Sequence, residues 1–320
     1  MSEVSPPVYC GLVVGVLVWG EGTLPVMEQP QFDFRHNNAV YWAAFDPAGQ
    51  TLVTASLDNT LKLWSLESGV LLHRLAGHVD GVSSAAFSSD GSKVVSASID
   101  RSLKVWDAQT GSLIATLTGG HQNHVTCLAL AKSGPLAASG GFDNLVRFWD
   151  VLAGTVGAPG AGHTGPVKAV AFSGDDQTLV SGSDDSTLKW WEVPTGKALR
   201  SIRAHEGSVE CVALPATGTL LASGGEDRLV KLWDATTGKP LTTLAGHTRF
   251  VKSLAFSPDG KTLASGGYDS VVQLWDLNTS QLVRTIRAHR NTVYSVAFST
   301  DGKWLATASF DRSIKVWKLA

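Results

Sequence analysis

The chain has 320 residues, of which 43% are hydrophobic and 17% charged, so it can bury a large core and is not a disordered chain. Lys and Arg number 26 and Asp and Glu 28, and this net charge of -2 lacks the basic excess of a typical nucleic-acid-binding protein. Three scattered cysteines, Cys10, Cys127 and Cys211, are too few for a disulfide framework.

The first distinctive segment is an apolar run at residues 8–19, VYCGLVVGVLVW. At 12 residues it is too short to span a membrane, and no transmembrane segment is expected. Two interpretations remain open. One is a signal peptide, although Glu3 and the lack of Lys or Arg before the run oppose it. The other is an extra strand that residues 20–22 turn back as a hairpin. We therefore divide the chain into an N-terminal segment, 1–22, and one domain, 23–320. A cytoplasmic location is expected, or export if residues 1–22 act as a signal peptide.

From residue 36 onwards, three residue types recur with a period of 42 or 43. The histidines are His36, His78, His121, His163, His205, His247 and His289. An aspartate follows each by 22 residues: Asp58, Asp100, Asp143, Asp185, Asp227, Asp269 and Asp311. A tryptophan follows six residues later: Trp64, Trp106, Trp149, Trp191, Trp233, Trp275 and Trp317. Seven matches in register at three positions indicate seven structural repeats.

Each repeat predicts four short strands. In the sixth, residues 251–256 alternate as a half-buried strand does, and the Ser-Pro-Asp-Gly turn at 257–260 leads to a second strand at 262–265. Further strands are predicted at 271–275 and 282–286. Helical periodicity is missing throughout. Four antiparallel strands at this spacing form one blade of a β-propeller, so the sequence predicts an all-β, seven-bladed propeller.

The pattern resembles the WD40 repeat family. The clearest copy, GHTRFVKSLAFSPDGKTLASGGYDSVVQLWD, starts at Gly246, and the resemblance runs from His36 to Trp317, 282 of the 320 residues. It implies a rigid, non-enzymatic scaffold for protein–protein interaction, acting as a monomer or as a subunit of a hetero-complex. Fold alone does not fix function, so the resemblance names no partner.

A hydroxyl residue lies four positions before each aspartate: Thr54, Ser96, Ser139, Ser181, Ser223, Ser265 and Thr307. Each repeat thus contains Ser or Thr, His and Asp, the residue types of a nucleophilic triad. A catalytic site is needed once, however, whereas a structural brace is needed in every blade. The resemblance implies a structural tetrad, in which Asp accepts from His, His bonds the hydroxyl, and the hydroxyl bonds the indole N–H of Trp. No catalytic residue and no cofactor are expected.

The remaining candidate ligands are few. His121 and His124, three residues apart, could suggest a metal pair, but no third ligand is near in the sequence, and a surface pair is the simpler interpretation. Cys127 and Cys211 each fall six residues after their histidine and are expected to be small core residues too far apart to bond. We therefore predict no metal site.

Two blades should have unusual outer strands. Only three residues follow Trp317, so the last blade needs a fourth strand from elsewhere, and an open edge would be an aggregation liability. We expect residues 26–34 to supply it and close the ring, with Phe34 playing the part of Leu75. In the third repeat the fourth strand falls at residues 156–162, VGAPGAG, whose Gly and Pro predict a loosened outer edge.

The resemblance also implies that three positions of each repeat point into the narrow face of the ring. These lie three and five residues after His and one before Asp. The candidate partner-binding residues at these positions are Tyr41, Phe142, Lys168, Asp184, Glu210, Glu226, Phe250, Lys252, Tyr268, Tyr294 and Phe310.

Aromatic faces beside carboxylates suit a protein or peptide partner that carries Arg or Lys. The plain alternative is that these are ordinary turn residues over a plugged channel. A small-molecule or glycan-binding propeller, exported or not, is the second functional hypothesis. An enzyme using the channel is the third, but it would need a polar cluster unique to one blade.

Overall fold

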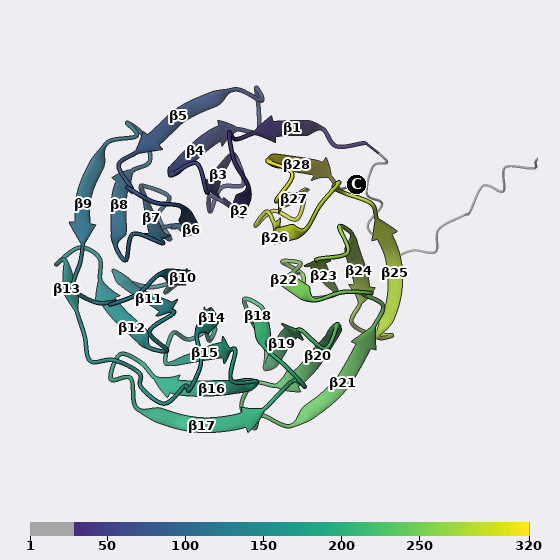
Figure 1. Ribbon diagram of the computed structural model, residues 1–320. Coiled ribbons are helices and arrows are strands. Elements are labelled where there is room, and N and C mark those ends of the chain that lie inside the picture. Colours follow the sequence, from purple (N-terminus) through teal and green to yellow (C-terminus); the bar gives the residue numbers. More distant parts are fainter. Residues whose placement is uncertain (1–28, 320) are drawn as a thin grey trace, which may run out of the picture.

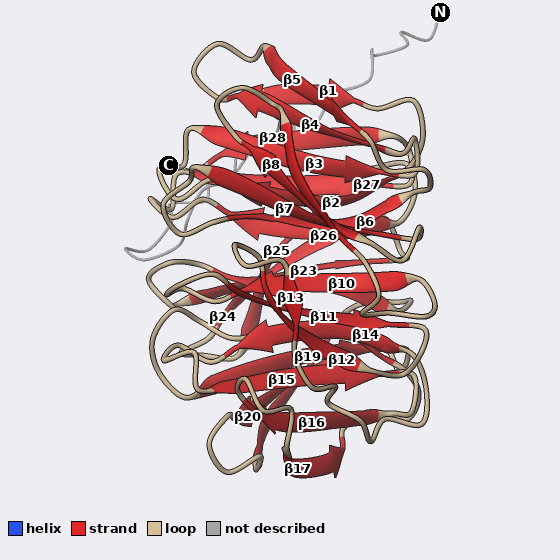
Figure 2. Ribbon diagram, turned by 90° about the vertical axis from the view of Figure 1, so that its left-hand side faces the viewer, coloured by secondary structure: helices blue, strands red, loops and turns tan. Residues whose placement is uncertain are grey.

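The structure, a computed structural model, describes residues 29–319. These residues form 28 strands and no helix. The strands make seven four-stranded antiparallel sheets arranged as blades around a central axis (Figure 1), and the side view shows strands joined only by loops and turns (Figure 2). The predicted all-β, seven-bladed propeller is confirmed.

Blades are numbered by their repeats. Blade 1 consists of β2 (Val40–Phe45), β3 (Thr51–Ser56), β4 (Thr60–Ser65) and β5 (Leu71–Ala76). Blade 2 consists of β6 (Val82–Phe87), β7 (Lys93–Ser98), β8 (Leu103–Asp107) and β9 (Leu113–Leu117). Blade 3 consists of β10 (Val125–Leu130), β11 (Leu136–Gly141), β12 (Val146–Asp150) and β13 (Thr155–Val156).

Blade 4 consists of β14 (Val167–Phe172), β15 (Thr178–Ser183), β16 (Thr187–Glu192) and β17 (Ala198–Arg203). Blade 5 consists of β18 (Val209–Ala213), β19 (Leu220–Gly225), β20 (Leu229–Asp234) and β21 (Pro240–Ala245). Blade 6 consists of β22 (Val251–Phe256), β23 (Thr262–Gly267), β24 (Val272–Asp276) and β25 (Gln281–Ile286). Blade 7 consists of β26 (Val293–Phe298), β27 (Trp304–Ser309), β28 (Ser313–Lys318) and β1 (Phe32–Arg35).

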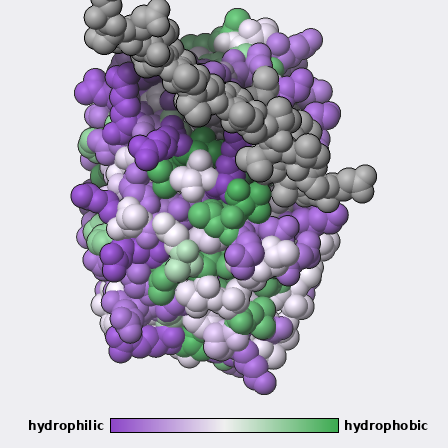
Figure 3. Space-filling model, turned by 90° about the vertical axis from the view of Figure 1, so that its right-hand side faces the viewer, coloured by the Kyte–Doolittle hydropathy of each residue, from purple (hydrophilic) through white to green (hydrophobic). Residues whose placement is uncertain are grey.

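The core lies between neighbouring blades. One cluster, for example, joins Val272 and Leu274 of blade 6 to Val293, Leu305 and Trp317 of blade 7, all nearly inaccessible to solvent. Each inner strand contributes to such a layer because its alternating residues face the next blade. The outer strands are covered on one face only, and leucines such as Leu241 and Leu282 remain exposed on the rim. On the side of the ring shown in Figure 3, hydrophobic residues form a stripe between hydrophilic margins.

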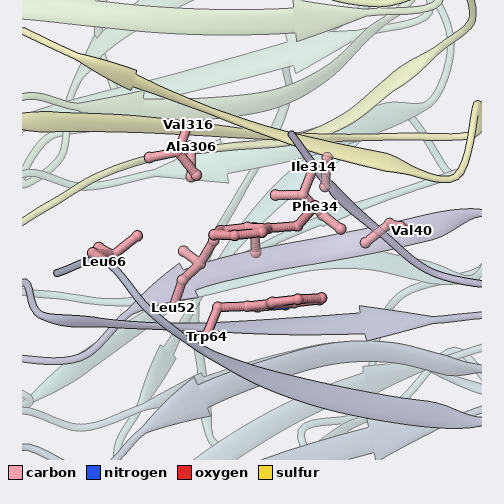
Figure 4. Packing of buried hydrophobic residues seen from close by; sticks show 10 residues of the cluster. Phe34, Val40, Leu52, Trp64, Leu66, Ala306, Ile314 and Val316 are labelled. Atoms are coloured by element: carbon pink, nitrogen blue, oxygen red, sulfur yellow. The ribbon is translucent and has the colours of Figure 1, made fainter. Parts of the chain in front are cut away.

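The ring closes through the N-terminal part of the described chain, as expected. Strand β1 pairs antiparallel with β28, with Phe34 opposite Ile314. The strand covers Phe32–Arg35, so it is shorter than the expected 26–34, of which residues 26–28 lie outside the described residues. Phe34 is buried and packs with Trp64 and Ile314 between blades 7 and 1 (Figure 4). Leu75 occupies the matching layer against Trp106.

Blade 3 has the predicted loosened edge. Its outer strand β13 contains only two residues, whereas the outer strand β17 of blade 4 contains six. Beyond β13, a single bridge joins Val146 to Gly160. The Gly and Pro residues of 156–162 prevent a regular ladder here.

The apolar run at residues 8–19, with Cys10, lies outside the described residues, so its two interpretations and the division at residue 22 stay predictions. Within residues 29–319 there is no helix that is long and apolar enough to cross a membrane.

Candidate partner-binding face

A four-residue hydrogen-bond network braces every blade. In blade 5, His205 Nδ1 lies 2.8 Å from Asp227, and His205 Nε2 lies 2.7 Å from the Ser223 hydroxyl, which accepts the indole N–H of Trp233 at 2.8 Å. The same three contacts occur in the other six blades. Each aspartate also accepts the backbone N–H of the residue after its histidine. All seven tetrads are therefore complete.

The burial of the tetrad hydroxyl groups sets the tetrads apart from catalytic triads. The hydroxyl residue of every tetrad, such as Ser223, is 0% exposed, so a substrate cannot reach its oxygen. Burial lowers the pKa of His36 and His163 below 6.5, although the neighbouring carboxylate opposes that change. Burial would raise the pKa of Asp185, but hydrogen bonds from Thr187, Thr164 and His163 outweigh it and lower the pKa to about 2. In blades 1 and 4, an ionised Asp next to a neutral His is therefore the stabilised state.

A β-bulge at the start of each inner strand directs one side chain into the central channel. In β22, Val251 pairs with Gly267 and Ser253 with Gly266, so Lys252 has no partner in the ladder. The other six inner strands shift register at the same place. A bulge re-aims the extra residue away from the regular alternation. The seven bulge residues are Tyr41, Ser83, Thr126, Lys168, Glu210, Lys252 and Tyr294.

All seven bulge residues line one cavity of about 440 Å³, which we call the central cavity. Seven of the eleven candidate residues line it: Tyr41, Phe142, Lys168, Glu210, Lys252, Tyr268 and Tyr294. The other four, Asp184, Glu226, Phe250 and Phe310, are not part of its lining. The repeats thus place one chemically different residue per blade around a common space.

The aromatic candidates of blades 6, 7 and 1 form a continuous arc. Tyr294 is its centre, with ring centroids 4.7 Å from Tyr41, 6.2 Å from Tyr268 and 6.2 Å from Phe310. Phe250 extends the arc at 5.5 Å from Tyr268. Burial raises the pKa of Tyr41 and Tyr294, so these phenols stay neutral hydrogen-bonding groups. Phe310 remains 45% exposed, which leaves aromatic surface open at this end of the arc.

Blades 4 to 6 contribute two charged pairs, and blade 3 contributes an aromatic ring. Lys168 lies 3.1 Å from Asp184 and stands over the ring of Phe142 at 4.8 Å. Lys252 forms an ion pair with Glu210. Burial alone would lower the pKa of Lys252 and raise that of Glu210, but their mutual attraction outweighs it, so the pKa of Lys252 is raised and that of Glu210 lowered. The two lysines therefore compensate two of the three candidate carboxylates.

The acidic residues outside the cavity meet at Ser208. Its hydroxyl donates to Asp184 at 2.6 Å, and its backbone N–H donates to Glu226 at 3.2 Å. Both carboxylate side chains belong to exposed residues. Glu226 makes no ion pair within residues 29–319, so its charge faces solvent beside the cavity.

Several residues of the central cavity were not among the candidates predicted from the sequence. Trp42, Ile99 and His124 all line the central cavity. His124 makes an edge-on contact with Phe142, with ring centroids 5.6 Å apart, whereas His121 belongs to the blade 3 tetrad. His124 occupies the position three residues after His, a signal that could have assigned it to this face. Trp42 follows a bulge, and only the fold shows what that residue faces.

The two described cysteines are buried, free and part of the cavity lining. Burial raises the pKa of the Cys127 thiol to about 11 and also raises that of Cys211, so both are poor nucleophiles at neutral pH. Within the part of the chain that the structure describes, no group of three His, Cys, Asp or Glu side chains could hold a metal ion.

The comparison with known families agrees with this geometry. A family model described as WD40 (WD domain, G-beta repeat) matches seven segments, residues 28–65, 69–107, 111–150, 159–192, 196–234, 238–276 and 280–318. The chain belongs to the WD40 family. The tetrads and bulges described above are thus features of seven WD40 repeats.

Similar curated WD40 relatives match only part of the chain. A Lissencephaly-1 homolog from Heterostelium pallidum is 39% identical over 106 residues, 33% of this chain and 25% of the relative. WD repeat-containing protein 18 from Mus musculus is 27% identical over 144 residues, and that from Rattus norvegicus 28% over 145 residues. Each of these two matches covers 42% of this chain and 31% of the relative. The matches thus span less than a third of each relative.

Proposed function

We propose that this WD40 propeller is a non-enzymatic protein-interaction scaffold that binds a peptide or protein segment on its narrow face. The central cavity of about 440 Å³, lined by a bulge residue from every blade, is the observation that carries the proposal. Three of its bulge residues carry charge and two are tyrosines, so the cavity presents apolar, hydrogen-bonding and ionic groups together.

A partner side chain of Arg or Lys fits the chemistry of this face. Lys168 already rests over Phe142 within cation–π distance, which supports the idea that these rings accept a cation. The exposed carboxylate of Glu226 lies beside the cavity without a cationic partner among the described residues and would pair with an incoming guanidinium. The open end of the aromatic arc at Phe310 supplies apolar contact area.

The lack of catalysis is part of the proposal. Its support is the sevenfold repetition of the Ser/Thr–His–Asp set together with the complete burial of each hydroxyl. A triad needs a nucleophile that touches its substrate, and none of these oxygens is accessible.

A small molecule or glycan is the second candidate ligand. The cavity volume falls within the range of about 300–1,000 Å³ for small-molecule sites. This observation favours no particular compound, and the experiment below separates the two candidates.

The test is affinity capture from a lysate of the source organism, followed by titration of the purified partner. Wild type is compared with a Tyr268→Ala, Phe310→Ala, Glu226→Lys triple variant that is shown to be folded. The matched control is Thr217→Lys, because Thr217 is exposed in the turn between β18 and β19, at the opposite end of the strands.

A partner that binds wild type and the control but not the triple variant supports the proposal. A partner retained by all three proteins would contradict the narrow-face site. If no protein binds and a metabolite or glycan co-purifies with wild type alone, the small-molecule alternative replaces the scaffold.

We also propose a cytoplasmic location, with export as the alternative if residues 1–22 act as a signal peptide. The intact mass of the protein isolated from cells tests this. A mature chain that lacks residues 1–22 would favour export instead.

A further inference from the structure

One position distinguishes blade 6 from the other blades. Two residues before the tetrad tryptophan, six blades carry a cationic residue: Lys62, Lys104, Arg147, Lys189, Lys231 and Lys315. Blade 6 carries Gln273 at this position. A glutamine side chain is shorter than a lysine and has no charge, so blade 6 lacks the ammonium group that this position supplies elsewhere.

The lysines of other blades show what surrounds that ammonium group. In blade 5, Lys231 Nζ donates to the carbonyl of Ala204 at 2.8 Å and lies 3.2 Å from Asp227. In blade 1, Lys62 Nζ donates to the carbonyl of Arg35 at 2.7 Å. Ala204 and Arg35 each directly precede a tetrad histidine. The carbonyl before the histidine thus accepts in two blades, and the tetrad carboxylate is a second acceptor in blade 5.

A hydroxyl on the outer strand is the third acceptor. Lys104 Nζ donates to Thr116 at 2.8 Å, and Lys189 Nζ donates to Ser201 at 2.9 Å. In both blades the hydroxyl residue lies directly opposite the lysine across the two outermost strands.

Blade 6 keeps all three acceptors without the lysine. The corresponding residues are Gly246 before His247, the tetrad Asp269, and Thr285, which lies opposite Gln273. Together with Gln273 they line a cavity of about 510 Å³, which we call the blade 6 cavity. Gln273 is only 4% exposed, and its Oε1 atom has no hydrogen-bond partner. Buried polar atoms normally have a partner, so this orphan acceptor points to a missing donor.

We propose that the blade 6 cavity binds the side-chain ammonium group of a lysine from a partner protein. The ammonium would donate to the carbonyl of Gly246, the carboxylate of Asp269 and the hydroxyl of Thr285. Gln273 Oε1 would accept one further hydrogen bond. Val271 and Leu282, which also line the cavity, would contact the alkyl chain. No residue lines both this cavity and the central cavity, so the site is separate from the proposed peptide site.

The lining of the blade 6 cavity contains one Lys or Arg residue. Arg287 lines the cavity, is exposed, and forms no ion pair within residues 29–319. Its charge opposes an incoming ammonium, so Arg287→Ala should tighten binding. If the Arg287 side chain itself filled the blade 6 cavity, an ammonium ligand would bind only to the Arg287→Ala variant.

The test uses N-acetyl-lysine-N-methylamide as the probe and its norleucine analogue, which lacks the ammonium, as the control ligand. Binding is followed by two-dimensional NMR of the full chain through the amide signals of Gly246, Gln273 and Thr285. We expect saturable shifts with the lysine probe and none with the norleucine probe. Gln273→Met, which keeps the size of the side chain but removes the acceptor, should weaken binding about tenfold or more.

Two matched variants control the result. Gln273→Lys restores the residue type of the other blades, so it should fold and should abolish binding by filling the cavity. Lys231→Gln creates the blade 6 arrangement in blade 5 and should add a second set of shifts at Ala204 and Thr243.

Four results would overturn the proposal: no saturable shift, equal shifts with both probes, binding retained in Gln273→Lys, or binding seen only in Arg287→Ala. Spermidine is titrated in parallel. Binding of spermidine with little response to the lysine probe would assign the cavity to a free polyamine and would contradict a partner lysine.

Discussion

Phe34 and Trp64 stack with their ring centroids 4.4 Å apart and their planes 10° from parallel. Phe34 lies on β1, which completes blade 7, whereas Trp64 lies on β4 of blade 1. The contact therefore joins the two blades at which the ring closes. Phe32 continues the stack at 5.3 Å from Phe34.

The closure predicts a strong effect of Phe34→Ala. The side chain is 6% exposed, and its removal leaves a cavity against Trp64 that the rigid neighbouring sheets cannot fill. We expect the free energy of unfolding to fall by about 3–5 kcal/mol. Urea unfolding monitored by tryptophan fluorescence measures this loss.

Asp33→Ala is the matched control on the same strand, because the Asp33 side chain is exposed and pairs only with the exposed Arg35. It should change stability by less than about 1 kcal/mol. Deleting residues 23–35 removes β1 altogether and should lower the melting temperature markedly. An unchanged melting temperature in the deletion would contradict closure by β1.

The tetrads predict that Asp227→Ala destabilises the fold. The carboxylate accepts from His205 and from the backbone N–H groups of Glu206 and Leu229, and leaving the buried His205 without its acceptor costs about 1–3 kcal/mol. Calorimetry should show a lower melting temperature, with a smaller loss for Asp227→Asn, which keeps one acceptor. Loss of a measurable catalytic rate in a folded Asp227→Ala variant would contradict the structural role of the tetrad.

Stability should fall as the pH is lowered. The pKa of His163 is below its ordinary 6.5 in the folded state, so the unfolded chain binds the proton first and unfolding is favoured as the pH falls through 6.5. The pKa of Asp185 is lowered from 3.8 to about 2, so its contribution is present above pH 3.8 and is lost towards pH 2. Urea midpoints across this range measure both stages.

The His163→Gln variant tests whether His163 causes the loss of stability near pH 6.5. The variant is less stable at neutral pH, but it has no proton to bind at this position. Its deficit relative to wild type should shrink as the pH falls below 6.5. A deficit that grows on acidification would show that the sign of the His163 effect is wrong.

The outer edge of blade 3 should exchange its amide hydrogens faster than those of its neighbours. Strand β13 has two residues and one further bridge, whereas five of the six residues of β17 have partners in β16. Fewer backbone hydrogen bonds must break to open residues 155–160. Hydrogen exchange followed by mass spectrometry checks this, and equal protection of Ala198–Arg203 and residues 155–160 would contradict it.

The repeat period and the strand pattern could be predicted because they depend on local order, and the tetrads were implied by the resemblance to WD40 repeats. A histidine, an aspartate and a tryptophan at fixed spacing specify one blade, and seven copies specify the number of blades. The expected closure of blade 7 by an N-terminal strand is likewise confirmed by the pairing of β1 with β28. The composition of residues 156–162 likewise predicted the weak edge of blade 3.

What the side chains face was decided by the tertiary structure. The bulges turn Lys168 and Lys252 inwards. Lys168 then pairs with Asp184 of its own blade, whereas the packing of blades 5 and 6 pairs Lys252 with Glu210. No sequence pattern distinguishes the role of Gln273. The structure shows that its Oε1 atom lacks a hydrogen-bond partner and that Gln273 shares a cavity with Gly246 and Asp269. Periodicity determines each blade, whereas the spatial neighbours of a side chain are decided by folding of the blade and by packing of blades into a ring, as for Lys252 and Glu210.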